Sequence, residues 1–546
     1  MSSKTISFAF ILQVLFFSFP AFVSAKTFHI NPSTGKMSND GSFANPWKTL
    51  KEVIDSNKIE TREGVTYPYV WGNPLKVKNP NGPVKAGDTI LLYNGYHGDI
   101  LIQRAYNTDF ITIAAAPNQT PAVKHLKLSA VCKWRVSGLV ISTELSPSYD
   151  AGALVVVESH NYSGPTREVI VENCTIYSVK DASKWTMAQW DTLSCDGITV
   201  TGDRVTVRGN TMTNVNFGIA LSGDSCVAER NSVINFAGDG LRGLGDYDEF
   251  WYNYVTGCYA VNANHDDGFQ SWSVGAGGVG TGVVKGIKLI GNKIINYTDP
   301  NQPFRGTLQG IGCFDGMFQD WVIENNVIMT DHWHGISLYG AINCRIVNNT
   351  VCDLNTVDPG PPWIMITSHK DGTKSTGCVI RNNLSTAVTN DGDATCVADH
   401  NIIIKTPNDF FTDYANFDLH LKAGCIAIDS GSSVLAPSID IAGGPRPVGR
   451  AVDVGAYEFG AAGSVQQHAR VTFKNRGNLC GNVVCNMRSG GQMLELPAEA
   501  SGFSVYDVNG KCLFVYKRKS GVAGRVSFKI PSHLAMGMLL IKPFIQ

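Results

Sequence analysis

Charged residues are scarce in this sequence, and neither sign is in excess. They make up 17% of the 546 residues, and the formal net charge at pH 7 is −1. A nucleic-acid-binding protein needs a basic excess to neutralise phosphates, so this balance argues against nucleic acid as a partner. It leaves an acidic substrate open, because a local basic patch or a bound cation can accommodate one.

Long apolar runs are missing beyond the first 25 residues. None approaches the roughly 18 apolar residues that a membrane-spanning helix needs. Near the start, Lys4 precedes an apolar stretch, and Val23-Ser24-Ala25 forms a small-residue cleavage site. This pattern is typical of a secretory signal peptide, with a membrane anchor as the alternative. We therefore expect residues 1–25 to be removed and the mature monomer to be secreted, outside the cell or at its surface.

Zinc-type cysteine pairs are absent as well. The chain has 14 cysteines but no CxxC pair with zinc spacing, so a structural zinc site is not expected. Several cysteines, such as Cys226 and Cys313, fall inside apolar strands, where buried free thiols are expected. Cys480 and Cys485 are the best candidates for a disulfide.

Two short motifs recur in one order along the middle of the chain. The first is a glycine-centred triplet: Asp196-Gly197-Ile198, Phe217-Gly218-Ile219, Asp239-Gly240-Leu241, Asp267-Gly268-Phe269, Gln309-Gly310-Ile311 and His334-Gly335-Ile336. The second is an asparagine that opens a strand: Asn173, Asn210, Asn231, Asn292, Asn326 and Asn349. The shortest spacing is 21 residues, from Asn210 to Asn231. A short period with β-branched runs indicates a solenoid, in which each coil buries its apolar side against its neighbours.

The repeat predicts three strands per coil. Residues 218–221, 226–228 and 232–234 read as strands, with a turn at 222–224 and a sharp corner at Asn231. Asparagine suits the corner because it tolerates positive φ and its side chain can hydrogen-bond to the corners above and below. We therefore predict an all-β fold, a right-handed parallel β-helix over residues 119–459.

The two ends of the chain differ from the coils. In residues 26–118, the N-terminal cap with the first coils, we expect a capping helix that begins with Asn45 as its N-cap and Pro46 at its first position. Such a helix covers the open end of a solenoid. In residues 463–546, alternating strands and the turn Asn509-Gly510 predict a small C-terminal β-sandwich.

The coil region resembles the pectate-lyase-like parallel β-helix superfamily. The opening Lys26–Leu50 looks like the start of many secreted members, and three segments are similar to the closing region of bacterial ones: 427–431, 440–447 and 453–458. The C-terminal part is similar to bacterial sorting domains, with an accessory module as the alternative. The resemblance implies a carbohydrate-active protein but is poorly specific for the reaction.

Side chains alternate along each predicted strand, so three columns should face outward. The first column is Asp196, Phe217, Asp239, Asp267, Gln309 and His334. The second is Thr199, Ala220, Arg242, Gln270, Gly312 and Ser337. The third is Thr201, Ser222, Leu244, Trp272, Phe314 and Tyr339. The intervening inward positions are all apolar, which supports this register.

This outward face predicts a polysaccharide-binding groove, because aromatic rings stack on sugar rings and carboxylates with an arginine bind hydroxyls, carboxylates or cations. We expect Asp196, Gln270, Trp272, Gln309 and Tyr339 to bind the substrate, and Asp239, Arg242, Asp267 and His334 to be catalytic. Asp239 and Asp267 fall on adjacent coils beside Asp266, and such crowding raises a pKa or recruits a cation, here Ca²⁺ held by these three residues. His265 and His332 flank the first column and are expected to be supporting or solvated groups.

Several functions fit these residues. A lyase would neutralise a uronate carboxylate and use Arg242 or His334 to remove the α-proton, giving β-elimination. A hydrolase would use the Asp pair as acid and base or nucleophile, in a pattern partly similar to polygalacturonases. A uronan epimerase or a non-enzymatic glycan-binding β-helix are further alternatives. Superfamily resemblance favours the polysaccharide lyase.

Overall fold

The computed structural model describes residues 25–461 and the backbone of six strands between residues 483 and 544. The predicted signal peptide and the side chains of Cys480 and Cys485 lie outside the described residues. Within them, no helix is long and apolar enough to cross a membrane. All eleven described cysteines are free, and ten of them are buried, as expected for thiols inside strands.

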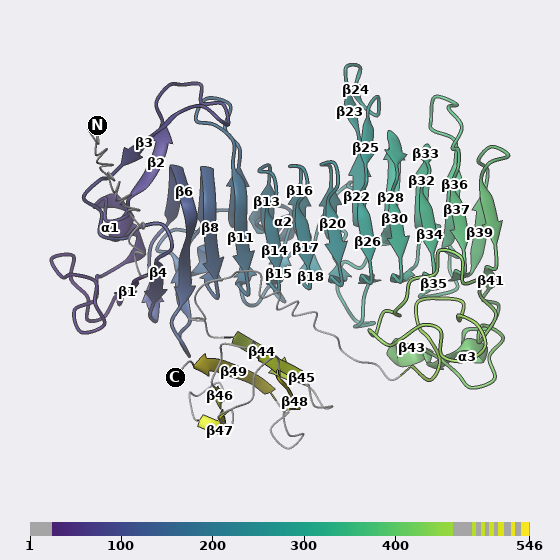
Figure 1. Ribbon diagram of the computed structural model, residues 1–546. Helices are drawn as coiled ribbons and strands as arrows, with labels where there is room; N and C mark the ends of the chain where they lie inside the picture. Colours follow the sequence, from purple (N-terminus) through teal and green to yellow (C-terminus); the bar gives the residue numbers. More distant parts are fainter. Residues whose placement is uncertain are drawn as a thin grey trace, which may run out of the picture.

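Residues 27–403 wind into a solenoid whose strands stack in three parallel columns (Figure 1). Column A, which carries the candidate site, contains β10 (Val155–Glu158), β13 (Ile198–Val200), β16 (Ile219–Leu221), β19 (Leu241–Gly243), β22 (Asp267–Trp272), β28 (Gln309–Asp315), β32 (His334–Tyr339), β36 (Trp363–Thr367) and β39 (Ala387–Asn390). The long strands β6 (Ile100–Ala115) and β8 (Leu126–Ser137) run from column A around the corner into column B.

The other two columns complete each coil. Column B also contains β1 (Thr27–Ile30), β4 (Thr89–Leu92), β11 (Arg167–Glu172), β14 (Thr206–Arg208), β17 (Val227–Glu229), β20 (Glu249–Trp251), β26 (Lys288–Ile290), β30 (Val322–Glu324), β34 (Arg345–Val347), β37 (Val379–Arg381) and β40 (Val397–Asp399). Column C contains β5 (Gly95–Tyr96), β7 (Pro121–Val123), β9 (Val140–Ile141), β12 (Thr175–Tyr177), β15 (Thr211–Val215), β18 (Ser232–Phe236), β21 (Tyr254–Cys258), β27 (Lys293–Ile295), β31 (Val327–Thr330), β35 (Thr350–Asp353), β38 (Leu384–Ser385) and β41 (Ile402–Ile403). The three strands predicted for the coil at residues 218–236 are confirmed as β16, β17 and β18.

Buried side chains from the three columns meet inside the coils. In column A the inward residues Ile198, Ile219, Leu241, Phe269, Ile311 and Ile336 stack in register and are at most 1% exposed. Each coil therefore covers the apolar interior of the next one, which is how a solenoid builds a continuous core from short repeats.

An asparagine ladder holds the corner between columns B and C. The side-chain oxygen of Asn231 accepts hydrogen bonds from the backbone N–H and the side-chain amide of Asn210, both at 3.0 Å. The same pair of bonds recurs along the ladder residues Asn231, Asn253, Asn292, Asn326, Asn349, Asn383 and Asn401. The predicted corner bonding is confirmed.

Two details of that prediction were wrong. Asn173 is one residue out of register, because Cys174 is the residue bonded to the Asn210 side chain. The positive φ also belongs to the residue before each ladder asparagine, for example 54° at Arg230 and 67° at Gly291. The ladder asparagine is selected by its side-chain bonds and not by a left-handed backbone.

The capping helix forms, but it begins later than expected. The helix α1 spans Leu50–Asp55, and its N-cap is Thr49, whose hydroxyl accepts from the Glu52 N–H at 3.2 Å. Asn45 is not the cap, because Trp47 is held in an extended segment by backbone bonds with His29 and Asn31. The buried Leu50 and Val53 confirm the apolar stripe that closes the first coil.

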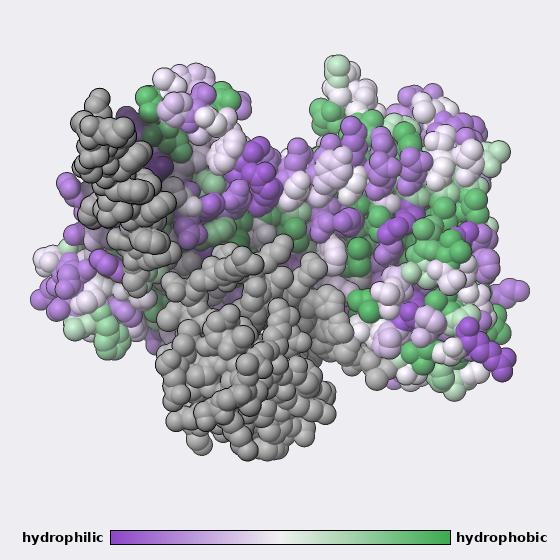
Figure 2. Space-filling view, in the orientation of Figure 1, coloured by the Kyte–Doolittle hydropathy of each residue, from purple (hydrophilic) through white to green (hydrophobic). Residues whose placement is uncertain are grey.

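Several elements rise from the coils or close their ends. Two hairpins project from one edge of the solenoid, β2 (Thr61–Gly64) with β3 (Leu75–Lys78) and β23 (Val274–Gly275) with β24 (Gly278–Val279), and the edge between them is largely hydrophilic (Figures 1 and 2). The other short elements are α2 (Met187–Leu193), α3 (Pro407–Phe410), the 3₁₀ turns Thr143–Leu145 and Tyr414–Asn416, β25 (Val283–Lys285), β29 (Met317–Gln319), β33 (Ala341–Ile342), β42 (Phe411–Asp413) and β43 (Asp418–Leu421).

The C-terminal strands pair in two antiparallel sheets. They are β44 (Val483–Met487), β45 (Met493–Leu496), β46 (Gly502–Tyr506), β47 (Cys512–Lys517), β48 (Val526–Lys529) and β49 (Gly537–Phe544). β46 and β47 pair antiparallel, which confirms the predicted hairpin; its turn at Asn509-Gly510 lies outside the described residues.

Candidate active site

The first two outward columns predicted from the sequence are in register. Asp267 pairs with Gln309, and Arg242 pairs with Gln270 on the neighbouring strand. The third column departs from the prediction at Phe314, because a β-bulge places Asp315 opposite Trp272. Asp239, Arg242, Gln270 and Trp272 line one groove of about 420 Å³, together with Phe217, His265 and Phe314.

The Arg242 side chain is fixed in this groove on three sides. Its Nε donates to Oδ2 of Asp239 at 2.5 Å. Its guanidinium lies 3.9 Å from the centre of the Phe217 ring and 5.3 Å from the centre of the Trp272 ring. Planar guanidinium groups stack well on aromatic faces, so the two rings hold the cation in one orientation. In the described part of the chain the two terminal nitrogens of Arg242 make no hydrogen bond or ion pair, which leaves them open to an anionic ligand.

Asp239 is 3% exposed, and its environment is set by two partners. Besides the Arg242 bond, its Oδ1 accepts from the backbone N–H of Asp267 at 3.1 Å. Burial raises the pKa of Asp239, and the charge of Arg242 opposes that shift. The carboxyl group therefore serves to orient Arg242 and has little surface of its own for a substrate.

Asp267 is fully buried, which corrects the expectation that it faces the groove. Gly312 is the physical reason: a Cβ at that position would lie only 2.2 Å from Oδ1 of Asp267, so the carboxyl fills the space that a side chain would occupy. Oδ2 accepts from the Gln270 amide at 2.9 Å and lies 3.4 Å from Nδ1 of His265. Burial raises the pKa of Asp267 to about 8.

His265 is the groove-facing partner of Asp267. Its side chain is 68% exposed, and its contact with Asp267 raises the pKa of the imidazole. Each of these two side chains therefore favours the charged form of the other. The sequence alone predicts a supporting or solvated role for His265 and does not predict this pairing. The signal that points to it is the spacing His265-x-Asp267, because alternate residues of an extended segment share a face.

The three carboxylates proposed to bind Ca²⁺ do not form a cation site. Asp239 is paired with Arg242, and Asp267 lies beneath Gly312. Asp266 turns towards Cys258, whose thiol donates to it at 3.5 Å, and burial raises the Asp266 pKa to about 7. Among residues 25–461 no three acidic, histidine or cysteine side chains lie close enough together to hold a metal ion. The donor set therefore does not fit calcium, and a cation requirement stays an untested prediction.

The insertion at residues 178–195 and the loop 259–266 form one packed wall beside the groove. α2 lies in the insertion, and its Trp190 stacks on Tyr259 with ring centres 4.3 Å apart. Asn262 in the loop donates to Asp191 of α2 at 2.7 Å. These contacts hold in place the loop that carries His265.

The remaining predicted residues lie outside this groove. Asp196 is half-buried and accepts from the Asn216 amide at 3.1 Å, and burial raises its pKa. Gln309 is buried, so it is not a surface contact for a substrate. His334 and Tyr339 belong to a neighbouring group of aromatic rings, joined to the groove through Phe314, whose ring centre is 4.7 Å from that of His334.

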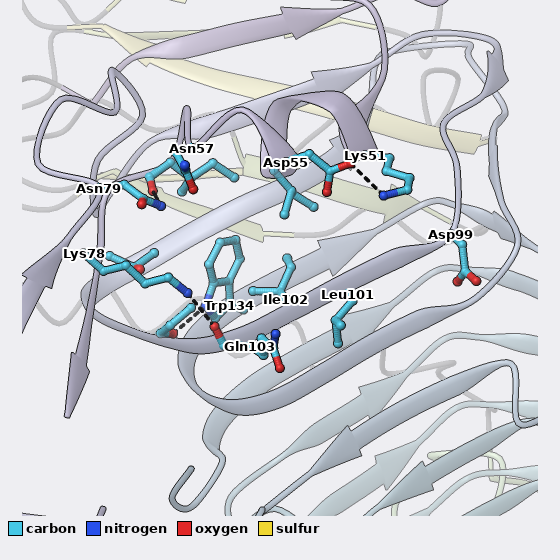
Figure 3. Close-up of a pocket in the computed structure, with 14 residues that line it drawn as sticks. Lys51, Asp55, Asn57, Lys78, Asn79, Asp99, Leu101, Ile102, Gln103 and Trp134 are labelled. Atoms are coloured by element: carbon cyan, nitrogen blue, oxygen red, sulfur yellow. Dashed lines mark hydrogen bonds and ion pairs between the residues drawn. The ribbon is translucent and has the colours of Figure 1, made fainter. Parts of the chain in front are cut away.

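A second cavity lies between the capping helix and the first coil, and it contains none of the predicted site residues (Figure 3). Its volume is about 270 Å³. The two lysines that line it are engaged: Lys51 pairs with Asp55 at 2.7 Å, and Lys78 donates to the Gln103 carbonyl at 2.9 Å. Burial lowers the pKa of Lys78. These contacts are those of a packed cap.

Residues 196–357 match the family model described as "Right handed beta helix region". Together with the stacked coils, this match confirms the predicted fold. The chain is a right-handed parallel β-helix protein. No curated protein matches its sequence.

Solved structures with a similar arrangement share little sequence with it. A pectate lyase is 13% identical over 79% of this chain and 96% of its own, with a TM-score of 0.39. A mannuronan C-5 epimerase module from Azotobacter vinelandii is 12% identical over 58% and 91%, with a TM-score of 0.40. A rhamnogalacturonan lyase is 12% identical over 71% and 90%, with a TM-score of 0.36.

Proposed function

We propose that this protein is a polysaccharide lyase that binds a uronate-containing glycan on column A and cleaves it by β-elimination. The observation that carries the proposal is the Arg242 guanidinium, held between Phe217 and Trp272 with its terminal nitrogens free, beside the exposed His265. A cation fixed in a groove is suited to pair with a uronate carboxylate, and this pairing makes the proton next to the carboxylate more acidic.

In this mechanism His265 is the base. Neutral His265 removes the proton α to the carboxylate, and the C–H electrons form the new double bond as the glycosidic C–O bond breaks. The leaving oxygen takes a proton from the His265 imidazolium or from water, so the reaction balances without an added reactant. Asp267 orients the imidazole and stabilises its charged form. Arg242 binds the carboxylate and stays protonated, in contrast to its expected role as a base.

The burial of the two aspartates disfavours hydrolysis by an Asp pair. A hydrolase needs one carboxyl group next to the glycosidic oxygen and a second next to the anomeric carbon or a water molecule. Asp239 is engaged by Arg242 and Asp267 lies beneath the strand surface, so neither is open to a sugar. Epimerisation would use the same proton removal without cleavage, and it is distinguished by its product.

Activity on purified polyuronates tests the proposal. The mature protein is incubated with several acidic and neutral polysaccharides, and both the ultraviolet absorbance of unsaturated uronate and the reducing ends are followed. Growth of both signals supports elimination. Reducing ends without the chromophore indicate hydrolysis, and epimerised polymer without new ends indicates an epimerase. Parallel reactions with a chelator report whether a cation contributes. Secretion, predicted from residues 1–25, is part of this proposal because a polymeric substrate lies outside the cell.

A further inference from the structure

A group of six ring side chains continues column A beyond the Arg242 groove. It consists of Phe314, His332, Trp333, His334, Tyr339 and Trp363, which we call the aromatic cluster. The His334 ring lies against Phe314, Tyr339 and Trp363, with centres 4.7, 6.1 and 5.3 Å away. Trp333 is 43% exposed and lies nearly parallel to Trp363, at an interplanar angle of 8°. A partly exposed group of rings of this kind can stack on the apolar face of a sugar.

The cluster carries no positive charge of its own near neutral pH. Burial and the neighbouring His332 lower the pKa of His334 to about 4, and burial together with the charge of His265 lowers the pKa of His332. Both imidazoles are therefore neutral. In the described residues none of the cation–π contacts involves these six rings, whereas Arg242 lies over both Phe217 and Trp272. The nearby Lys370 is paired with Asp315 at 2.6 Å.

Hydrogen bonds fix which nitrogen of His334 is protonated. Trp363 Nε1 can only donate, and it donates to Oγ of Ser337 at 3.1 Å. Ser337 is fully buried, and among the described residues the other hydrogen-bond partner of its hydroxyl is Nδ1 of His334, 2.9 Å away, so we assign the hydroxyl proton to that nitrogen. The proton of the neutral imidazole therefore sits on Nε2. The cluster offers ring faces and one neutral donor, which suit the apolar face and a hydroxyl of an uncharged sugar.

The cluster lies on the same strand face as Arg242. Arg242, Gln270, Gly312 and Ser337 occupy one register position on successive strands. Three strand spacings separate Arg242 from Ser337, about 14 Å. A single sugar unit cannot reach both places, but an oligosaccharide lying along column A contacts both. Phe314 lines the Arg242 groove and belongs to the cluster, so the surface between them is continuous.

We propose that the aromatic cluster binds an uncharged sugar unit of the glycan whose uronate lies on Arg242. The substrate is then a heteropolysaccharide that contains both uronic acids and neutral sugars, and a polymer of uronic acids alone is a poorer ligand. This inference rests on the proposed function. A second carboxylate placed on the cluster would lose its hydration beside neutral imidazoles, because the nearby His265 is engaged by Asp267, whereas a neutral ring loses little.

Binding of two oligosaccharides of equal length tests this assignment. One is an oligogalacturonide, and the other alternates galacturonate with rhamnose, a neutral sugar. Calorimetric titrations compare the wild-type mature protein with Trp333→Ala and with the control Trp71→Ala. Trp71 is 42% exposed, close to the 43% of Trp333, and its ring contacts Tyr106 and Arg167 of the first coils. Trp333→Ala should leave the backbone in place, because it is the Trp333 carbonyl that accepts hydrogen bonds from the Gly335 and Trp363 N–H groups, and alanine keeps that carbonyl.

We expect the wild type to bind the alternating oligosaccharide about tenfold more tightly than the oligogalacturonide. Trp333→Ala should remove that preference, and Trp71→Ala should keep it. Equal affinities in the wild type, equal losses for both ligands in Trp333→Ala, or no binding of either ligand would overturn the inference. An Arg242→Gln variant separates this from the proposed function. If it binds both ligands as the wild type does while Trp333→Ala loses the preference, the neutral-sugar site stands and the uronate role of Arg242 fails.

Discussion

Asp239 lies two residues before β19 and Arg242 is the middle residue of that strand, and the guanidinium Nε donates to the carboxyl Oδ2 at 2.5 Å. The Asp239 side chain is nearly buried, and a quarter of the Arg242 side chain is exposed. The carboxylate thus fixes the cation, while the opposite edge of the cation stays open to the groove. This division of roles favours anion binding over acid–base catalysis by Asp239.

Replacing Arg242 by lysine should lower kcat/KM on the substrate about 100-fold. Lysine keeps the charge but cannot lie flat between Phe217 and Trp272 or bind a carboxylate with two parallel N–H groups. Steady-state kinetics measure the loss, with Arg208→Lys as the control, because Arg208 pairs with Glu172 on column B at 2.6 Å. Activity of Arg242→Lys within twofold of the wild type would contradict the carboxylate-binding role.

The rate should rise with pH, with a midpoint above the ordinary histidine value of 6.5. His265 must be neutral to act as a base, and its contact with Asp267 raises its pKa. In Asp267→Asn the imidazolium loses its stabilising carboxylate, so the midpoint of kcat/KM should move down towards 6.5, and the maximal rate should fall about tenfold. His265→Ala should abolish the pH dependence together with most of the activity. An unchanged midpoint in Asp267→Asn would show that another group titrates.

Asp248 should make the protein less stable at alkaline pH. It is fully buried, its Oδ1 accepts from the Cys226 N–H at 2.8 Å, and burial raises its pKa to about 8. A carboxyl group whose pKa is higher in the folded than in the unfolded chain stabilises the fold when the pH is below its pKa in the unfolded chain. This stabilisation is lost as the pH rises through its pKa in the folded chain. Between about pH 4 and pH 8 the free energy of unfolding should therefore decrease.

Asp248→Asn keeps the acceptor for Cys226 and removes the titration. The fall in stability from pH 5 to pH 8 should shrink in this variant, by a free energy of about 4 kcal/mol. Thermal unfolding at several pH values measures it, with the exposed Asp320→Asn as the control. The same fall in both variants would show that Asp248 ionises without cost.

The asparagine ladder should be costly to interrupt. Asn292 is 1% exposed; its amide donates to the Phe250 carbonyl and to Asn326, and its oxygen accepts from Asn253. Asn292→Ala leaves several buried polar groups unpaired and should destabilise the protein by roughly 3 kcal/mol. Asn408→Ala, at an exposed position, should change little. Equal melting temperatures for the two variants would contradict the structural role of the ladder.

The fold could be predicted because a solenoid repeats the same sequence pattern in every coil. The inward residues of column A and the asparagine corners recur at one register, so each coil supports the assignment of the others. Local details were less predictable. Asn45 and Pro46 have the composition of a helix start, but backbone bonds between Trp47 and the first strand place the start at Leu50.

The candidate site could be predicted only in part, because the register of a strand does not determine how deeply an outward side chain is buried. Asp267 and Arg242 both occupy outward positions, but Gly312 provides a space that buries Asp267, and Phe217 with Trp272 holds Arg242 at the surface. The role of His265 depends on how a loop outside the repeat folds against α2. Such contacts between inserted segments carry no periodic signal in the sequence.

The most direct measurement is the appearance of unsaturated uronate when the mature protein acts on glycans that contain uronic acid. With the wild type we expect ultraviolet absorbance and reducing ends to grow together, and we expect both to be lost in Arg242→Gln and His265→Ala. New reducing ends without the unsaturated product, or full activity in either variant, would contradict it.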